Sequence, residues 1–122
     1  MARFHVIVAE DNSDTRAMVK WLLEQHGYQV DTASDGVVAL NLIGRSNPDL
    51  ILTDLQMPNL SGIESIKRLR QDRKTATTPV VAMSAFGPEE LERATAAGAN
   101  LIIRKPEGIL ELADKVKSLL PA

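Results

Sequence analysis

The feature that most constrains the fold is a strict alternation between short apolar runs and longer segments with helical periodicity. Each apolar run is short, rich in β-branched residues and bounded by turn residues, which predicts a strand buried on both faces. The segment after each run repeats its apolar residues at helical spacing, which predicts a helix. We therefore expect a parallel sheet with helices on both faces. The expected strands are residues 4–9, 28–33, 50–53, 80–83 and 101–103.

Capping and turn residues set the expected helix ends. In chain order, the expected starts are Ser13 or Asp14, Asp35-Gly36, Ser61-Gly62 and Pro88, and the expected stops are Gly27 and Gly98. The inward-facing residues are expected to be Met18, Val19, Leu22 and Leu23 in the first helix and Val38, Ala39, Leu40 and Ile43 in the second. The charged run RLRQDRK, residues 68–74, is interpreted as a solvated helix end.

Length and composition narrow the class of protein. The chain has 122 residues with 44% hydrophobic and 25% charged, which predicts one globular domain over residues 1–122. The start at Met1 favours a stand-alone protein. A net charge of −2 without a basic block gives no support for nucleic-acid binding. The apolar runs are far shorter than the roughly 20 residues of a membrane span, and the absence of cysteine fits the cytoplasm.

Polar side chains follow the strands where ligands bind in open α/β folds, beyond the carboxyl ends. Glu10 and Asp11 follow the first strand, Asp54 the third, Ser84 the fourth and Lys105 the fifth. Three carboxylates, a hydroxyl and an ammonium are therefore expected to converge at one edge of the sheet. Crowded carboxylates repel one another, and a hard divalent cation such as Mg²⁺ relieves this repulsion.

This set of groups fits phosphoryl chemistry. Lys105 is a compact positive charge for a phosphoryl oxygen, and the hydroxyl of Ser84 can donate a hydrogen bond to another. Asp54, beside a metal ion and a lysine, can act as a nucleophile toward phosphorus and form an aspartyl phosphate. For Asp54 alone, a turn or capping role is the ordinary interpretation, and only the convergence of the set favours function.

The chain resembles the receiver domain of response regulators in two-component signalling, in particular the chemotaxis-type single-domain regulators. The resemblance covers essentially all 122 residues and rests on four motifs in order, VIVAED, ILTDLQMPNLSG, VVAMSA and IIRKP. It implies a doubly wound, flavodoxin-like sheet of five parallel strands in the order 2-1-3-4-5 with five helices. It also implies a switch rather than a turnover enzyme, one that slowly removes its own phosphoryl group.

The resemblance assigns roles to the acidic side. Asp54 is similar to the family's phosphoacceptor, and Asp11 to its direct Mg²⁺ ligand. Glu10 resembles a ligand that acts directly or through water. Gln56 stands where the family uses a backbone carbonyl as a further metal ligand, so its side chain is expected to matter less.

The resemblance also assigns the phosphate side and the partners. Ser84 resembles the switch hydroxyl and Lys105 the phosphate-pairing lysine, with a cis bond between Lys105 and Pro106. The implied phosphoryl donor is a histidine kinase or a histidine phosphotransfer protein. The implied output is a downstream protein that binds the face of the fourth helix, fifth strand and fifth helix.

One position departs from the family pattern, and another is expected to lie beside the phosphate site. Ile102 stands three residues before Lys105, where the family often has an aromatic residue that swings inward on activation, so that rotamer switch cannot operate here. Phe86 follows Ser84 by two residues and is expected to flank the phosphate and restrict attacking water.

Three other functions have less support in the sequence than the switch. A haloacid-dehalogenase-like phosphatase also uses an aspartyl nucleophile, but it needs a second Asp two residues on, where Gln56 stands here. A receiver used as a phosphorylation-independent interaction module predicts the loss of Asp11, Asp54 or Lys105, and all are present. A nucleotide or flavin binder ranks last because no glycine-rich phosphate-binding motif occurs.

Overall fold

A computed structural model describes residues 3–85 and 87–120. Within these residues five parallel strands form one sheet in the order β2-β1-β3-β4-β5, which confirms the predicted fold class. The strands are β1 (His5–Ala9), β2 (Gln29–Ala33), β3 (Leu50–Asp54), β4 (Val80–Ser84) and β5 (Leu101–Arg104). The helices are α1 (Ser13–Gln25), α2 (Gly36–Arg45), α3 (Gly62–Gln71), α4 (Pro88–Ala97) and α5 (Leu112–Leu119), with a 3₁₀ turn, η1 (Glu107–Glu111), before α5.

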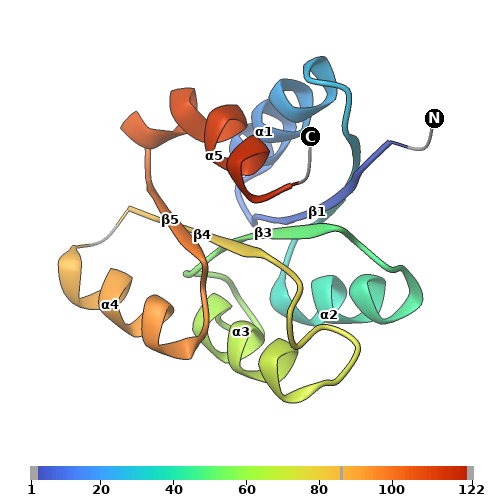
Figure 1. The fold of residues 1–122 in the computed structure, drawn as a ribbon. Coiled ribbons are helices and arrows are strands. Elements are labelled where there is room, and N and C mark those ends of the chain that lie inside the picture. The colour runs from blue at the N-terminus through green and yellow to red at the C-terminus, as the bar shows by residue number, and fades with distance from the viewer. Residues whose placement is uncertain (1–2, 86, 121–122) are drawn as a thin grey trace.

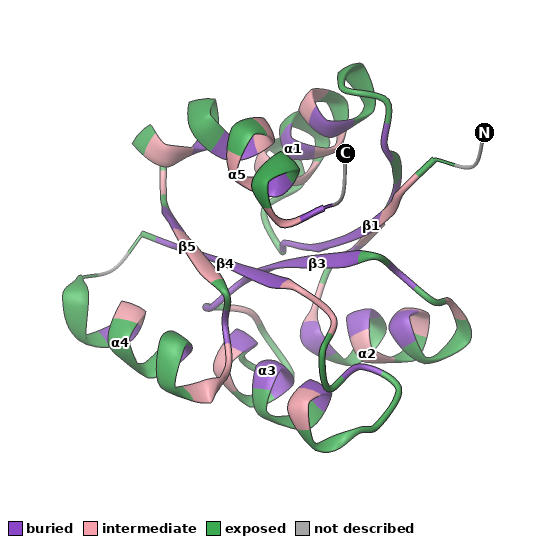
Figure 2. Ribbon diagram, in the orientation of Figure 1, coloured by how far each residue is buried: buried purple, intermediate pink, exposed green. Residues whose placement is uncertain are grey.

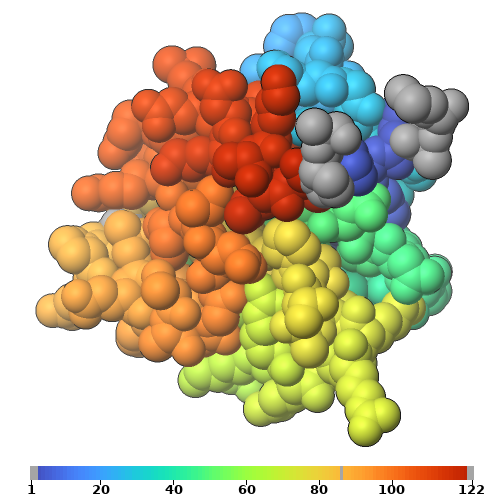
Figure 3. Space-filling model, viewed as in Figure 1, coloured from blue at the N-terminus to red at the C-terminus, as the bar shows by residue number. Residues whose placement is uncertain are grey.

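The helices cover the sheet in two layers. Figure 1 shows α1 and α5 on one face and α2, α3 and α4 on the other. In the space-filling view, the red surface of α5 lies beside the light-blue surface of α1 (Figure 3). Figure 2 shows β1, β3 and β4 almost wholly buried between the layers, as the apolar runs predict. This arrangement leaves the two ends of the sheet, rather than its faces, available for a site.

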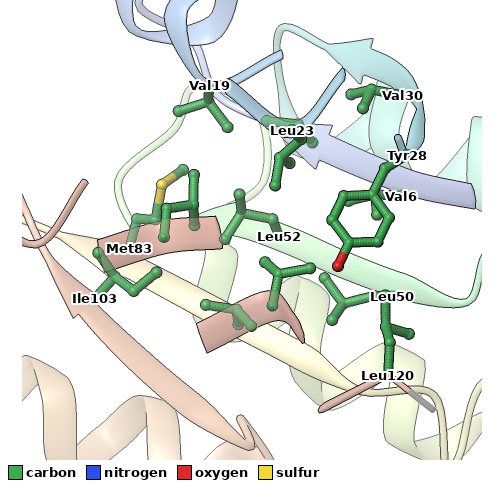
Figure 4. Packing of buried hydrophobic residues seen from close by; sticks show 14 residues of the cluster. Val6, Val19, Leu23, Tyr28, Val30, Leu50, Leu52, Met83, Ile103 and Leu120 are labelled. Carbon is green, nitrogen blue, oxygen red and sulfur yellow. The ribbon is translucent and has the colours of Figure 1, made fainter. Parts of the chain in front are cut away.

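Each face of the sheet has its own apolar core. On the α1 and α5 side, Leu52 and Met83 of the strands point toward Val19 and Leu23 of α1 (Figure 4). Leu112 and Val116 of α5 and the ring of Tyr28 also belong to that cluster. On the other side, the strands pack against residues of α2, α3 and α4, namely Ile43, Ile66, Leu69 and Ala94.

Two expectations about the first two helices were wrong in detail. Asn12, rather than Ser13 or Asp14, is the N-cap of α1, because its Oδ1 accepts a hydrogen bond from the N–H of Thr15 at 2.9 Å. Met18 and Val38 were expected to face inward, yet they are 44% and 43% exposed. Each lies one position before a buried residue, so its helix turns it just outside the apolar stripe.

The starts of α2 and α3 and the ends of α1 and α4 follow the predicted signals. Asp35 and Ser61 cap α2 and α3, accepting hydrogen bonds from the N–H groups of Val38 and Glu64. Gly27 and Gly98 end α1 and α4 with positive φ angles of 88° and 123°, which few other residues adopt without strain. Among the helices of residues 3–85 and 87–120, none combines the length and the apolar character that a bilayer crossing requires.

Candidate functional site

The candidate site lies at the carboxyl edge of the sheet, where four strands bring their polar ends together. β1 lies beside β3, β3 beside β4, and β4 beside β5, so the residues that end these strands become neighbours. Two backbone hydrogen bonds fix the edge: Leu55 N–H donates to the carbonyl of Met83 at 3.0 Å, and Lys105 N–H donates to the carbonyl of Ser84 at 2.8 Å.

Three carboxylates converge there. Glu10, Asp11 and Asp54 each offer one oxygen, and these oxygens lie within 4.8 Å of one another. Glu10 and Asp54 are buried, whereas Asp11 is exposed. A set of hard oxygen donors at this spacing, open to solvent through one member, fits a divalent cation such as Mg²⁺ that keeps some of its water.

A lysine from the opposite end of the chain closes the cluster. The ammonium of Lys105 donates to Oδ2 of Asp54 at 2.6 Å and to Oε1 of Glu10 at 2.6 Å. The Lys105 side chain is 16% exposed, so these ion pairs are largely shielded from water and weakly screened. The peptide bond between Lys105 and Pro106 is cis, as the resemblance implied.

Burial and neighbouring charges shift the pKa values of Glu10 and Lys105. Burial raises the pKa of Glu10 from 4.5 to about 7, although the hydrogen bond from Lys105 pulls the pKa down. Burial alone would lower the pKa of Lys105. The hydrogen bonds and charges of Asp54 and Glu10 outweigh that effect and raise the pKa above its usual value. Lys105 therefore stays charged beside Asp54 at neutral pH.

The loop after β3 fixes the orientation of Asp54. The N–H of Gln56 donates to Oδ1 of Asp54 at 3.1 Å, so the two carboxylate oxygens have different partners. Gly62 allows the start of α3 to approach this loop, since a Cβ at that position would lie 2.1 Å from the carbonyl oxygen of Asp54. The predicted residues of this side of the site are thus held by a tightly packed turn.

One residue of the site region was missed by the sequence reasoning. Glu90, in the first turn of α4, is only 8% exposed, and its carboxylate accepts hydrogen bonds from Gln56 and Ser84. Glu90 does not directly follow a strand, so the rule that ligand-binding residues follow strands does not select it. A usable signal was its spacing, because Glu90 lies four residues before the buried Ala94 and hence on the inner face of α4.

The predicted site residues form a central cluster with two neighbours, Ser84 and Gln56, of which Gln56 donates its N–H to Asp54. The structure brings Glu10, Asp11, Asp54 and Lys105 into one cluster. Ser84 is fully buried and adjoins that cluster through its backbone bond to Lys105. Phe86, expected to flank the phosphate, lies outside the described residues.

This fold with an acidic cluster and a lysine at its carboxyl edge defines a class of phosphoacceptor domains, and comparison with known proteins agrees. Residues 6–117 match the response regulator receiver domain family. The chain belongs to this family, whose members are regulatory phosphoacceptors in two-component signalling.

Individual relatives are consistent with the family. The chain is 40% identical over 121 residues to the phosphate regulon transcriptional regulatory protein PhoB of Escherichia coli. That match covers 98% of this chain and 52% of PhoB, so the chain spans about half the length of this relative.

Two solved structures share the whole fold. The chemotaxis response regulator CheY4 of Vibrio cholerae has a TM-score of 0.91 at 29% identity, with 98% of this chain and 100% of that chain covered. The response regulator TrrA of Thermotoga maritima, solved in complex with Mg²⁺-BeF, has a TM-score of 0.86 at 30% identity. That match covers 96% of this chain and 99% of TrrA.

Proposed function

We propose that this chain is a phosphoacceptor switch of a two-component phosphorelay, with Asp54 as the residue that receives the phosphoryl group. The observation that carries the proposal is the 2.6 Å contact of Asp54 with Lys105 inside a cluster of carboxylates. The contact places the proposed nucleophile, Asp54, beside a fixed positive charge, Lys105, that can bind phosphoryl oxygens. The donor is a phosphohistidine of a histidine kinase or of a histidine phosphotransfer protein.

The proposed phosphoryl transfer to Asp54 is a displacement at phosphorus. A carboxylate oxygen of Asp54 forms a bond to phosphorus while the bond from phosphorus to the donor's imidazole nitrogen breaks. The electron pair of that bond returns to the ring nitrogen, which takes up a proton from solvent. Lys105 offsets the negative charge on one phosphoryl oxygen, and the hydroxyl of Ser84 donates a hydrogen bond to another.

Mg²⁺ is the metal ion that this donor set fits. Glu10, Asp11 and Asp54 would hold it, with the backbone carbonyl of Gln56 as a further ligand. When bound, the ion supplies positive charge that offsets the repulsion between the carboxylates and the phosphoryl oxygens. The complex of TrrA with Mg²⁺-BeF supports this choice of ion.

The phosphorylated domain would act as a signal rather than as a turnover enzyme. New bonds from Ser84 and Lys105 to the phosphoryl group favour one of two arrangements of the surface made by α4, β5 and α5, which a downstream protein reads. Water then hydrolyses the acyl phosphate slowly. We assign this role to residues 1–122 as one receiver domain and place the exchange in the cytoplasm.

Intact-mass measurement tests the proposal directly. The purified chain is incubated with MgCl₂ and acetyl phosphate, and a gain of one phosphoryl group per chain is expected. Asp54→Asn, which keeps the size of the side chain but removes the nucleophile, should show no gain, and EDTA should abolish the gain in the wild type. Asp49→Asn, at the other end of β3, is the matched control and should be phosphorylated like the wild type.

The alternatives give different results in the same assay. A phosphatase would release phosphate steadily from several phosphomonoesters and accumulate no modified chain. A phosphorylation-independent interaction module would show neither modification nor release. Either result would overturn the proposal.

A further inference from the structure

Glu90 links two parts of the site that the proposed phosphoryl transfer uses separately. Its Oε2 accepts a hydrogen bond from Nε2 of Gln56 at 3.0 Å, and its Oε1 accepts one from Oγ of Ser84 at 3.4 Å. Gln56 belongs to the loop after β3, and Ser84 is the last residue of β4. One carboxylate on α4 therefore connects the loop next to Asp54 with the hydroxyl proposed to bind the phosphoryl group.

The setting of Glu90 makes these two hydrogen bonds important for its charge. The residue is 8% exposed, so its carboxylate has lost most of its water and depends on donors within the protein. The N-terminus of α4 also favours a negative charge in this turn. Glu90 is not a member of the carboxylate cluster formed by Glu10, Asp11 and Asp54, so metal binding does not account for its burial.

The hydroxyl of Ser84 has a single hydrogen, which it donates to one acceptor at a time. In this structure Oγ lies 3.4 Å from Oε1 of Glu90, which accepts a hydrogen bond from it. To donate to a phosphoryl oxygen on Asp54, the hydroxyl must give up that bond, and the Glu90 carboxylate then loses a donor while a second negative group forms nearby. Binding of the phosphoryl group and the bond between Ser84 and Glu90 are therefore mutually exclusive.

From this exclusion we propose that Glu90 is a positioning residue that holds Ser84 in its unphosphorylated arrangement and so opposes the phosphorylated state. The inference rests on the proposed phosphoacceptor function and adds a residue to it. It also provides a route for the signal, because loss of the Ser84 bond loosens the first turn of α4, where Glu90 is anchored.

Beryllofluoride, a mimic of the phosphoryl group, tests this inference without a kinase. Its affinity for the full chain at saturating Mg²⁺ is measured by isothermal titration calorimetry. Glu90→Ala removes the competing acceptor, so we expect beryllofluoride to bind about fivefold more tightly, the worth of one modest hydrogen bond. Glu89→Ala removes the same charge from the same turn at an exposed position, and it should leave the affinity within about twofold of the wild type.

A double-mutant cycle separates a positioning role from a general structural one. In a Ser84→Ala background no hydroxyl remains for Glu90 to hold, so adding Glu90→Ala should not change the affinity. If the gain persists in that background, or if Glu90→Ala binds beryllofluoride no more tightly than the wild type, the inference is overturned. Glu90→Leu, which keeps much of the side-chain volume but has no oxygen to accept the bond, replaces Glu90→Ala if the latter does not fold.

Hydrogen exchange gives a second, independent readout of the same contact. We expect the amides of Glu90 and Leu91, which donate to the carbonyl of Gly87, to exchange faster in the wild type once beryllofluoride is bound. In Glu90→Ala they should exchange fast even without beryllofluoride. Unchanged protection in both cases would contradict the proposed route through α4. A wild type that binds no beryllofluoride with Mg²⁺ would instead refute the phosphoacceptor function itself, so the two failures are distinguishable.

Discussion

Nζ of Lys105 lies 2.6 Å from Oδ2 of Asp54, and the same ammonium lies 2.6 Å from Oε1 of Glu10. The three groups come from the ends of β5, β3 and β1, so this contact joins strands that are far apart in the sequence. Glu10 is fully buried, and without Lys105 its charge would be poorly compensated. Lys105 therefore stabilises the folded chain in addition to its proposed role toward phosphate.

Replacing Lys105 should destabilise the protein in a pH-dependent way. Lys105→Met leaves the buried carboxylate of Glu10 without its cation, and we expect a loss of about 3 kcal/mol in the free energy of unfolding at pH 8. At pH 5 the loss should be clearly smaller, because Glu10, whose pKa is already about 7, is then protonated and neutral. Urea denaturation in magnesium-free buffer at the two pH values measures the difference.

Two further variants control this prediction. Lys67→Met, at an exposed position of α3, should change the stability by no more than about 0.5 kcal/mol. Adding Glu10→Gln to Lys105→Met removes the charge that Lys105 compensated, and it should restore part of the loss at pH 8. An equal loss at both pH values would show that the charge of Glu10 is not the cause.

The raised pKa of Glu10 predicts a pH dependence of stability with a definite sign. The unfolded chain releases this proton near pH 4.5, whereas the folded chain keeps it until about pH 7. The folded state thus binds more protons over this interval, and the contribution of Glu10 to stability falls as the pH rises. We expect the wild type to lose up to about 3 kcal/mol relative to Glu10→Gln over that interval. Parallel stability curves for the two proteins, measured by urea denaturation, would contradict this.

Most of the site could be predicted because its residues end strands. A short apolar run fixes the position of a strand, and the parallel topology brings Glu10, Asp54, Ser84 and Lys105 to one edge whatever the details of packing. The cap of α1 was harder to predict, since Asn12, Ser13 and Asp14 are all good capping residues. The backbone angles of this turn, rather than residue type, select Asn12.

Residues that act across helices were not predicted. Glu90 and Arg70 stand among other charged residues, PEELER and RLRQDRK. The spacing to Ala94 places Glu90 on the inner face of α4, but nothing in the local sequence identifies the partners of either residue. Arg70 was assigned to a solvated helix end, yet it binds the backbone of two other segments. Such contacts depend on how α3 and α4 pack together, which the pattern of a single helix does not determine.

Arg70 should be among the most sensitive surface positions of the chain. Its guanidinium donates to the carbonyls of Thr75, Thr78 and Gly98 at 2.7–3.1 Å and to the side chain of Asn100 at 2.8 Å. Arg70→Ala removes all of these hydrogen bonds, although the carbonyl of Thr75 and Oδ1 of Asn100 keep the N–H groups of Thr78 and Val80 as donors. We expect a loss of about 2–4 kcal/mol in the free energy of unfolding, measured by urea denaturation.

Two variants serve as comparisons for Arg70→Ala, namely Arg68→Ala and Arg70→Lys. Arg68→Ala removes a charge from the same helix, but its partner Glu64 lies 3.7 Å away on the surface, so we expect a change below about 0.5 kcal/mol. Arg70→Lys keeps the charge but cannot reach several carbonyls with one ammonium, and it should lose most of what Arg70→Ala loses. Full stability in Arg70→Lys would show that charge, not geometry, matters at this position.

Gly62 is the position where a single methyl group should disturb the proposed phosphoacceptor loop. A Cβ there would lie 2.1 Å from the carbonyl oxygen of Asp54 and 2.7 Å from Cα of Leu55, both of them backbone atoms that cannot rotate away. Gly62→Ala must therefore displace the chain beside Asp54 or the start of α3. We expect a loss of about 2–3 kcal/mol in stability, measured by urea denaturation, and slower phosphorylation by acetyl phosphate.

Gly44, in the last turn of α2, offers a matched control for Gly62. No heavy atom of the described residues outside its own helix turn lies within 4 Å of a Cβ built at Gly44, and the position is exposed. Gly44→Ala should therefore raise the stability by about 0.5–1 kcal/mol, because alanine restricts the unfolded chain and favours the helix. The two substitutions add the same methyl group, but we expect them to change the free energy of unfolding in opposite directions. If Gly62→Ala were as stable as the wild type and took up phosphate at the same rate, close packing against the Asp54 backbone would not be needed to orient that carboxylate.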